Sequence, residues 1–66
     1  MRISKEKYEL TLARQCKTNT EIIQDGNFRR ATFFKMIRGE ECKPITVGKL
    51  AKVLGCDVED LLRNEA

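Results

Sequence analysis

The sequence predicts an all-α fold, a compact bundle of five short helices in a single domain. Apolar residues recur at helical spacings, and residues that begin or end helices separate these stretches. No stretch shows the sustained alternation of apolar and polar residues that is typical of strands. A chain of 66 residues has room for one small domain, and 41% hydrophobic against 35% charged residues is typical of a globular protein.

The first predicted helix begins after Ser4, whose hydroxyl can cap the free N–H groups of the first turn. Tyr8, Leu12 and Cys16 follow one another at intervals of four residues. This spacing places them on one side of a helix, so we expect them to form its buried stripe. Leu10 falls outside the stripe.

The second predicted helix is opened by a capping box. Thr18 and Glu21 have the spacing at which each side chain can bond to the other residue's backbone N–H, and Ile22 and Ile23 follow directly. The helix must be short, because Asp-Gly-Asn at residues 25–27 is typical of a tight turn. A short helix followed by a tight turn is therefore expected here.

The third predicted helix lies within residues 28–39 and is ended by Gly39. Its inward-facing residues are expected to be Phe28, Phe33, Met36 and Ile37. Thr32 is expected to be buried against the second helix. The outward side is predicted to carry Arg30, Ala31, Phe34 and Lys35. This helix would therefore present a cationic surface.

The last two predicted helices share the remaining core positions. Pro44 suits the first position of the fourth helix, where its missing N–H costs nothing, and Gly55 ends that helix. The apolar stripe of the fourth helix consists of Val47, Leu50, Ala51 and Leu54. Asp57 and Asp60 can cap a fifth helix, which returns Val58, Leu61 and Leu62 to the core.

The basic residues are concentrated in the first part of the chain. Residues 1–39 contain nine basic and four acidic side chains, whereas residues 40–66 contain four basic and six acidic ones. Between Phe28 and Gly39 there are four cations and no acidic residue. Such a local excess is expected where one face meets a polyanion.

The same composition argues against an enzyme, a metal site and a membrane protein. The chain has no histidine, no Gly-rich phosphate loop and no paired cysteines, so we expect no catalysis, cofactor or metal. Cys16, Cys42 and Cys56 are expected to behave as small apolar residues. No membrane span or secretion signal is recognisable, which predicts a cytoplasmic protein.

Several segments together resemble one family. Residues 18–23 (TNTEII), 27–33 (NFRRATF) and 36–39 (MIRG) are similar to the second helix, the turn and the recognition helix of the Cro and phage-repressor type of helix-turn-helix, the xenobiotic-response-element family. Residues 45–62, with KLAKVLGCDVEDLL inside them, resemble the fourth and fifth helices of that family. The resemblance covers nearly the whole chain and implies a lambda-repressor-like bundle, with its helix-turn-helix at about residues 18–39.

The resemblance also implies a function, sequence-specific binding of double-stranded DNA by a transcriptional repressor. Residues 29–38 would then enter the major groove. The implied base contacts are Arg30, Ala31, Phe34 and Lys35. The implied phosphate contacts are Thr18, Asn19, Arg29, Arg38 and Lys43. Members of this size often act as homodimers on palindromic operators, so a homodimer is a possible partner besides the DNA.

The chain departs from the family's pattern at four positions. Asn27 stands where glycine is usual, and Arg29 and Lys43 stand where polar N-caps are usual. Leu12 lies near the position of an arginine that often pairs with the second-helix glutamate, here Glu21. These departures leave the fold intact but change the expected local contacts.

Two other functions remain open from the sequence. An antitoxin-like or anti-repressor module could keep the same fold and bind a protein partner. RNA binding is the second alternative, but recognition of single strands needs exposed aromatic side chains for stacking. Phe34 is the only good candidate for that role.

Overall fold

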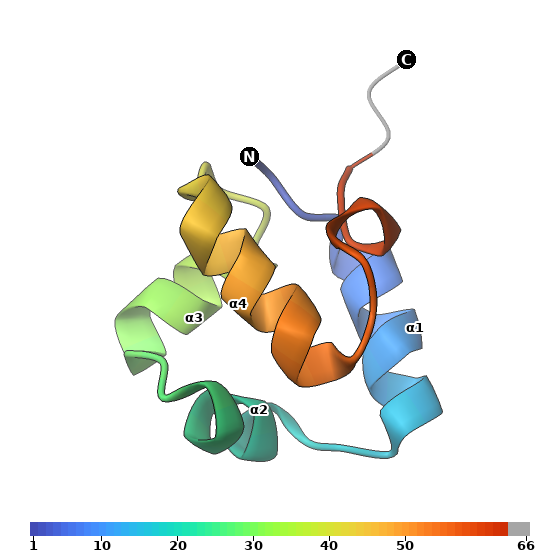
Figure 1. Cartoon of the computed structure of the whole chain (residues 1–66). Helices are drawn as coiled ribbons and strands as arrows, with labels where there is room; N and C mark the ends of the chain where they lie inside the picture. Colours follow the sequence, from blue (N-terminus) through green and yellow to red (C-terminus); the bar gives the residue numbers. More distant parts are fainter. Residues whose placement is uncertain (64–66) are drawn as a thin grey trace.

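The computed structural model describes residues 1–63, which contain four α-helices and one short 3₁₀ helix joined by loops (Figure 1). They are α1 (Lys5–Gln15), α2 (Asn19–Gly26), α3 (Arg30–Ile37), α4 (Pro44–Leu54) and η1 (Val58–Asp60). The all-α prediction is confirmed, and the fifth predicted helix is a single 3₁₀ turn of three residues. None of the helices in this part of the chain is long and apolar enough to cross a membrane.

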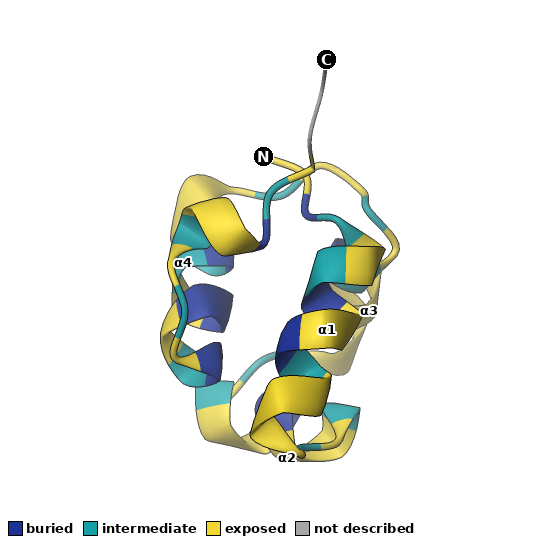
Figure 2. Cartoon of the chain, turned by 90° about the vertical axis from the view of Figure 1, so that its right-hand side faces the viewer, coloured by how far each residue is buried: buried dark blue, intermediate teal, exposed yellow. Residues whose placement is uncertain are grey.

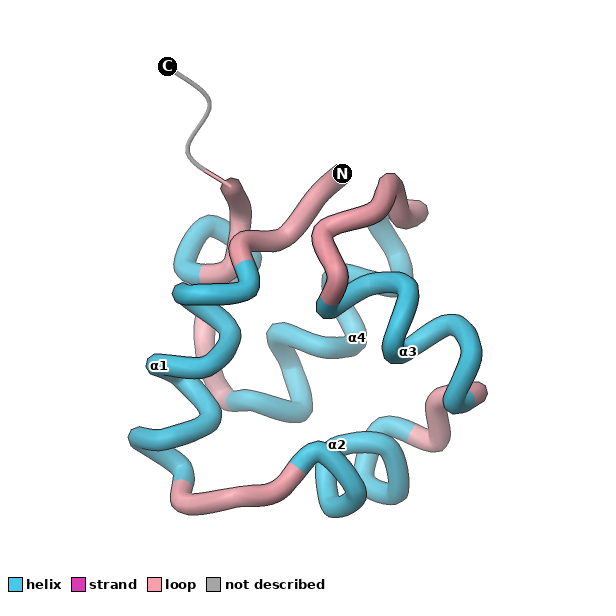
Figure 3. Tube along the Cα trace, turned by 180° about the vertical axis from the view of Figure 1, so that it is seen from behind, coloured by secondary structure: helices cyan, strands magenta, loops and turns pink. Residues whose placement is uncertain are grey.

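The helices enclose one core. Figure 2 shows α4 on one side, α1 and α3 on the other, and α2 across the end of the bundle, with the buried residues facing inward. The tube in Figure 3 shows the molecule from the side opposite to Figure 1, with α1 and α3 in front of α4. The most extensive helix contacts of α4 are with α2, and it also packs against α1 and η1. The buried apolar residues are Ile3, Tyr8, Ile22, Ile23, Phe33, Met36, Val47, Leu50, Ala51, Leu54 and Leu61.

The buried stripe of α1 differs from the predicted one. Tyr8 is buried as expected, but Leu12 is half-buried and Cys16 is exposed. The helix ends before Cys16, which takes the left-handed conformation of a C-cap with φ of 53°. The second buried position is Thr11, whose hydroxyl donates a 2.9 Å hydrogen bond to the carbonyl of Lys7. This bond satisfies the hydroxyl, so a polar residue can occupy a core position.

The predicted capping box at the start of α2 is confirmed. The Thr18 hydroxyl accepts from the backbone N–H of Glu21, and the Glu21 carboxylate accepts from the N–H of Thr18. The helix runs further than expected, through Gly26, and the left-handed residue is Asn27 with φ of 52°. A Cβ on Gly26 would lie 2.1 Å from the ring of Phe28, so the absence of a side chain makes room for that ring.

The inward face of α3 is largely as predicted. Phe33 and Met36 are fully buried, and Phe28 and Ile37 are half-buried against the core. The exception is Thr32, which is exposed rather than buried against α2. Phe33 and Met36 fill the inward side of the helix, and position 32 lies at the border of that side.

The predicted ends of α3 and α4 and the predicted apolar stripe of α4 are confirmed. Gly39 and Gly55 have φ of +86° and +70°, in the left-handed region that glycine enters without steric cost. The stripe residues Val47, Leu50, Ala51 and Leu54 are all buried. Pro44 is the first residue of α4.

The two ends of the described chain are joined by backbone bonds. Ile3 and Leu62 form an isolated antiparallel bridge, and the N–H of Arg63 donates to the carbonyl of Arg2 at 3.1 Å. Ile3 and Leu61 are fully buried here. The sequence analysis missed Ile3 as a core residue, because a single apolar residue before a helix carries no periodic signal.

Candidate nucleic-acid interface

The exposed side of α3 is the candidate site. The four residues predicted to contact bases, Arg30, Ala31, Phe34 and Lys35, are all exposed. They occupy positions i, i+1, i+4 and i+5 of one helix, which place them on the same side. We call these four residues the α3 surface. The helix is held against the core by the fully buried side chains of Phe33 and Met36.

The segment that carries the α3 surface is rich in basic residues. Residues 26–39 contain no acidic side chain, and Arg29 and Arg38 add two exposed cations beside those of Arg30 and Lys35. Among residues 1–63, neither Arg29, Arg30 nor Lys35 forms an ion pair. Within the described chain, three of these four cations therefore have no anionic partner.

Arg38 differs from the other cations of this region. Its Nη2 lies 2.7 Å from Oε2 of Glu40, and both side chains are largely exposed. An exposed ion pair of this kind contributes only about 0–1 kcal/mol, so a phosphate oxygen can compete for the guanidinium. The sequence analysis did not foresee this pair, although the two residues are close in the chain.

An aromatic contact orients Arg30. Its guanidinium carbon lies 5.8 Å from the centroid of the Phe34 ring, within the range of a cation–π contact. The Phe34 ring in turn meets the ring of Phe33 edge to face, with the centroids 5.5 Å apart and the planes at 81°. Phe33 is fully buried, so the contact links an exposed guanidinium to the core.

The predicted phosphate contacts at the start of α2 are already engaged within the protein. The Thr18 hydroxyl serves the capping box with Glu21, whose carboxylate would repel a nearby phosphate. The Oδ1 atom of Asn19 accepts a 2.6 Å hydrogen bond from the hydroxyl of Tyr8. Thr18 is therefore a structural cap, and the amide nitrogen of Asn19 is the remaining side-chain donor of this pair.

Two predicted phosphate contacts are N-cap residues without a capping side chain. Arg29 precedes α3 and Lys43 precedes α4, and neither side chain bonds to the backbone of its helix. Both are exposed. Their side chains are therefore available for an outside partner, at the cost of the stabilisation that a Ser or Asp cap would give.

The structure adds exposed polar residues that the sequence analysis did not nominate. Asn27 lies in the turn between α2 and α3, and Thr32 lies on α3 next to Ala31. A signal for Asn27 was present, because a tight turn is expected to be exposed. For Thr32 the helical spacing was misleading, since it placed this residue with the core.

The cysteines and acidic residues form no second site in the described part of the chain. All three cysteines are free of disulfides, and residues 1–63 contain no group of Cys, Asp or Glu side chains placed to hold a metal ion. Burial raises the pKa of the Cys42 and Cys56 thiols, which favours the neutral form. Both are half-buried against the core, as expected for small apolar residues, whereas Cys16 is exposed.

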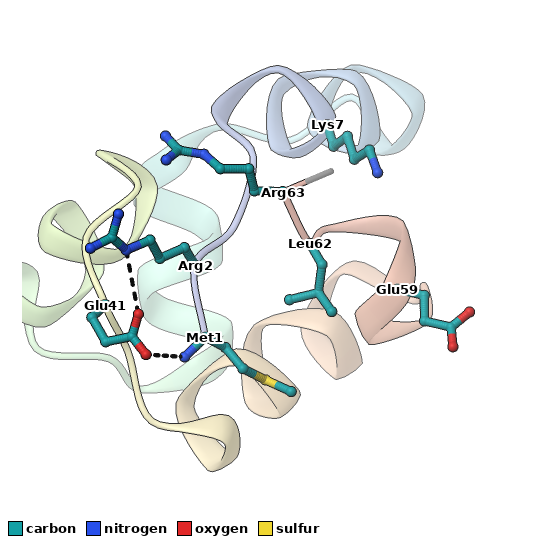
Figure 4. Close-up of a pocket in the computed structure, with 7 residues that line it drawn as sticks. All are labelled: Met1, Arg2, Lys7, Glu41, Glu59, Leu62 and Arg63. Atoms are coloured by element: carbon teal, nitrogen blue, oxygen red, sulfur yellow. Dashed lines mark hydrogen bonds and ion pairs between the residues drawn. The ribbon is translucent and has the colours of Figure 1, made fainter. Parts of the chain in front are cut away.

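An open hollow of about 980 Å³ lies where the two ends of the described chain meet (Figure 4). It is lined by Met1, Arg2, Lys7, Glu41, Glu59, Leu62 and Arg63. The amine of Met1 and Nε of Arg2 lie 2.8 and 3.4 Å from the Glu41 carboxylate. The hydrogen bond from the amine, its charge and Arg2 hold the pKa of Glu41 below its usual range. The lining mixes both signs of charge and includes no residue of α2 or α3, so the hollow is separate from the α3 surface.

The structure thus brings the four predicted base contacts together and adds Arg29 and Arg38 beside them. Of the other predicted contacts, Lys43 lies across the loop at the start of α4, and Thr18 and Asn19 begin α2. Comparison of the chain with models of protein families, with curated proteins and with solved structures finds no match.

Proposed function

We propose that the chain is a sequence-specific DNA-binding protein in which α2 and α3 form a helix-turn-helix and α3 enters the major groove. The observation that carries the proposal is the exposed, acid-free and cationic side of α3, set on two buried anchors. A helix with its side chains is about 10–12 Å across, and the major groove is about 12 Å wide. A helix of this kind fits the groove with its cations near the phosphates on both sides.

The α3 surface supplies the chemistry for reading bases. The guanidinium of Arg30 can donate two hydrogen bonds to O6 and N7 of a guanine, and Lys35 can donate to the same acceptors. Ala31 and Phe34 offer apolar surface for the methyl group of thymine. Each of these groups is exposed in the free protein, so binding requires no unfolding of α3.

The surrounding cations would position the helix on the backbone of the duplex. Arg29, Arg38 and Lys43 are exposed and belong to the ends of α3 and α4. Contacts to phosphates carry no sequence information but provide much of the affinity and make it depend on salt. Asn19 can add a hydrogen bond from its amide nitrogen.

Occupation of an operator by this protein would repress transcription, and pairing of two copies would read a palindrome. Centres of half-sites one helical turn apart are separated by about 34 Å. The Cα trace extends 32 Å along its longest axis, and side chains add to this length. Two copies bound to adjacent half-sites would therefore be close enough to touch, and no long dimerisation helix is needed.

Binding titrations with fluorescent probes test this proposal. Affinity for duplex DNA should fall steeply between 50 and 200 mM salt, with a log–log slope of about −3 if three phosphate contacts form. The Arg29→Ala, Lys43→Ala double variant should reduce this slope by about two. The matched control Lys49→Ala, Lys52→Ala removes the same charge from α4 and should leave the slope nearly unchanged.

The same titrations separate the alternative functions. Absence of salt-dependent duplex binding, together with tight binding to a co-purified protein, would overturn the proposal in favour of a protein-interaction module. Tighter binding to single-stranded RNA than to duplex DNA would also overturn it. Selection from random duplexes then shows whether one sequence is preferred and whether that sequence is symmetric.

A further inference from the structure

Arg30 and Phe34 lie in contact on the α3 surface. The guanidinium carbon lies 5.8 Å from the centroid of the Phe34 ring. The Phe34 ring also packs edge to face against the ring of Phe33, which is fully buried. Phe34 nevertheless remains 37% exposed, so part of the ring faces solvent beside the guanidinium.

No carboxylate of the described chain competes for the Arg30 guanidinium. The acidic residues that flank residues 26–39 are Asp25 and Glu40. Asp25 lies 3.2 Å from Nζ of Lys17, and Glu40 lies 2.7 Å from Nη2 of Arg38. The orientation of Arg30 therefore comes from an aromatic ring, which leaves all five N–H donors of the guanidinium without an ionic partner.

We propose that Arg30 and Phe34 together read a guanine and the methyl group of a thymine in the neighbouring base pair. This inference depends on the proposed DNA-binding function and specifies the base step that it recognises. The guanidinium bonds to O6 and N7 of the guanine, and the exposed edge of the ring contacts the thymine methyl. Readout by the pair then depends on both side chains at once.

The geometry suits two adjacent base pairs. Bases follow one another at about 3.4 Å along a strand, and the 5.8 Å between guanidinium carbon and ring centroid spans one to two such steps. A guanidinium already held over the ring also loses less side-chain freedom when it binds, so its hydrogen bonds are formed at lower entropic cost. A lysine at position 30 could neither stack in this way nor bond to guanine through a planar fork.

The test begins with selection of bound duplexes by the full chain and by Arg30→Ala. The guanine whose preference is lost in Arg30→Ala identifies the base that Arg30 reads. Deoxyuridine is then placed at the neighbouring thymine, which removes only its methyl group. We expect about fourfold weaker binding by the unmodified protein, the effect of one buried methyl group, and no such loss for Phe34→Ala. Deoxyuridine at thymines elsewhere in the site should have no effect that depends on Phe34.

Further variants separate the roles of the two side chains. Phe34→Leu keeps an apolar contact but lacks the ring, so it should retain part of the methyl effect and lose part of the preference for guanine. Arg30→Lys keeps the charge and should lose most of that preference. Ile45→Ala truncates another exposed apolar residue, on α4, and should leave both effects intact.

The outcomes distinguish this inference from the proposed function. If no duplex is bound in a sequence-dependent way, both are wrong. If a sequence is selected but deoxyuridine weakens binding of the unmodified protein and of Phe34→Ala equally, only the pairing of Arg30 with Phe34 is wrong. The same holds if no thymine lies next to the guanine that Arg30 reads.

Discussion

The hydroxyl of Tyr8 donates a 2.6 Å hydrogen bond to Oδ1 of Asn19 and so ties the middle of α1 to the first residue of α2. The Tyr8 ring is buried and lies edge to face against Phe33, with the ring centroids 6.0 Å apart. One side chain therefore contacts the helices on both sides of the turn that leads into the α3 surface. Because Tyr8 uses the oxygen of the Asn19 amide, the nitrogen of that amide is left as a donor for an outside acceptor.

Replacing Tyr8 by Phe should remove this bond and keep the packing of the ring. We expect a loss of about 1–2 kcal/mol in the free energy of unfolding, because Oδ1 of Asn19 loses a partner in a half-buried position. Urea unfolding followed by circular dichroism measures the change. An unchanged midpoint would show that water replaces the hydroxyl without cost.

The raised pKa of Tyr8 predicts a loss of stability at high pH. Burial, with a smaller contribution from Glu9, raises the pKa of Tyr8 from 10.0 to about 12. Between these values the unfolded chain has released the phenolic proton and the folded chain still holds it, so rising pH favours unfolding. The contribution of the protonated Tyr8 to the free energy of unfolding is therefore fully present below pH 10 and is lost as pH rises through 12. Unfolding titrations at intervals across this range should show the decline in the unmodified protein and a shallower one in Tyr8→Phe.

Replacing Gly26 or Gly48 by alanine should change the free energy of unfolding in opposite directions. A Cβ at position 26 would lie 2.1 Å from Cε2 of Phe28, so Gly26→Ala must displace a ring that packs 6.0 Å from Phe33. We expect a destabilisation of about 1–3 kcal/mol, as for overpacked positions generally. A Cβ at position 48 would meet no atom within 4 Å beyond its chain neighbours and the backbone of its own helix, so Gly48→Ala should stabilise α4 by about 0.5–1 kcal/mol. Thermal unfolding of both variants compares them directly, and a common direction of change would contradict this view of Gly26.

The Thr18 hydroxyl should matter for folding and not for binding. Thr18→Ala breaks the capping box with Glu21 and should cost about 1 kcal/mol in the free energy of unfolding. Its affinity for a random duplex should equal that of the unmodified protein at temperatures where both are folded. A loss of affinity larger than that of Asn19→Ala would instead make Thr18 a phosphate contact.

Arg30 and Arg38 should differ in what they do on DNA. Arg30→Ala should weaken binding to the selected sequence by about 1–3 kcal/mol and relax the preference at one position. Arg38→Ala should weaken binding to selected and random duplexes by similar factors and reduce the salt dependence. Titration of both variants against both duplexes measures the difference. If the two variants behaved alike on both probes, the assigned roles would be wrong.

The helical plan of this chain could be predicted from its sequence because its signals are local. The capping box at Thr18, Pro44 at the start of α4 and the glycines at 39 and 55 act within a few residues of the chain. The apolar stripe of α4 is regular and was predicted completely. Local chemistry therefore determines where these helices begin and end.

Other features depend on contacts between distant residues and were missed or misplaced. Burial of Ile3 depends on its bridge to Leu62, at the other end of the described chain. Thr11 is buried because the side of α1 that carries Tyr8 faces Phe33. Cys16 is exposed because α1 ends at Gln15, one residue before the last position of the predicted stripe. The spacing of apolar residues in α1 alone could not indicate this register.

The candidate site likewise has features that the sequence could predict and features that it could not. Its charge and the outward direction of Arg30 and Lys35 follow from one helix, so the sequence was sufficient to nominate them. The ion pair of Arg38 with Glu40 and the use of Asn19 by Tyr8 depend on side-chain conformations and on neighbouring elements. These contacts reduce the number of side chains that remain available for the proposed phosphate contacts.

The bond between Arg63 and Arg2 has a practical consequence for handling the molecule. A fluorophore or an immobilising tether joined near either residue would leave from one pole of the bundle, opposite α2 in Figure 1. A protein immobilised through either residue would therefore present the same face of the bundle to a ligand in solution.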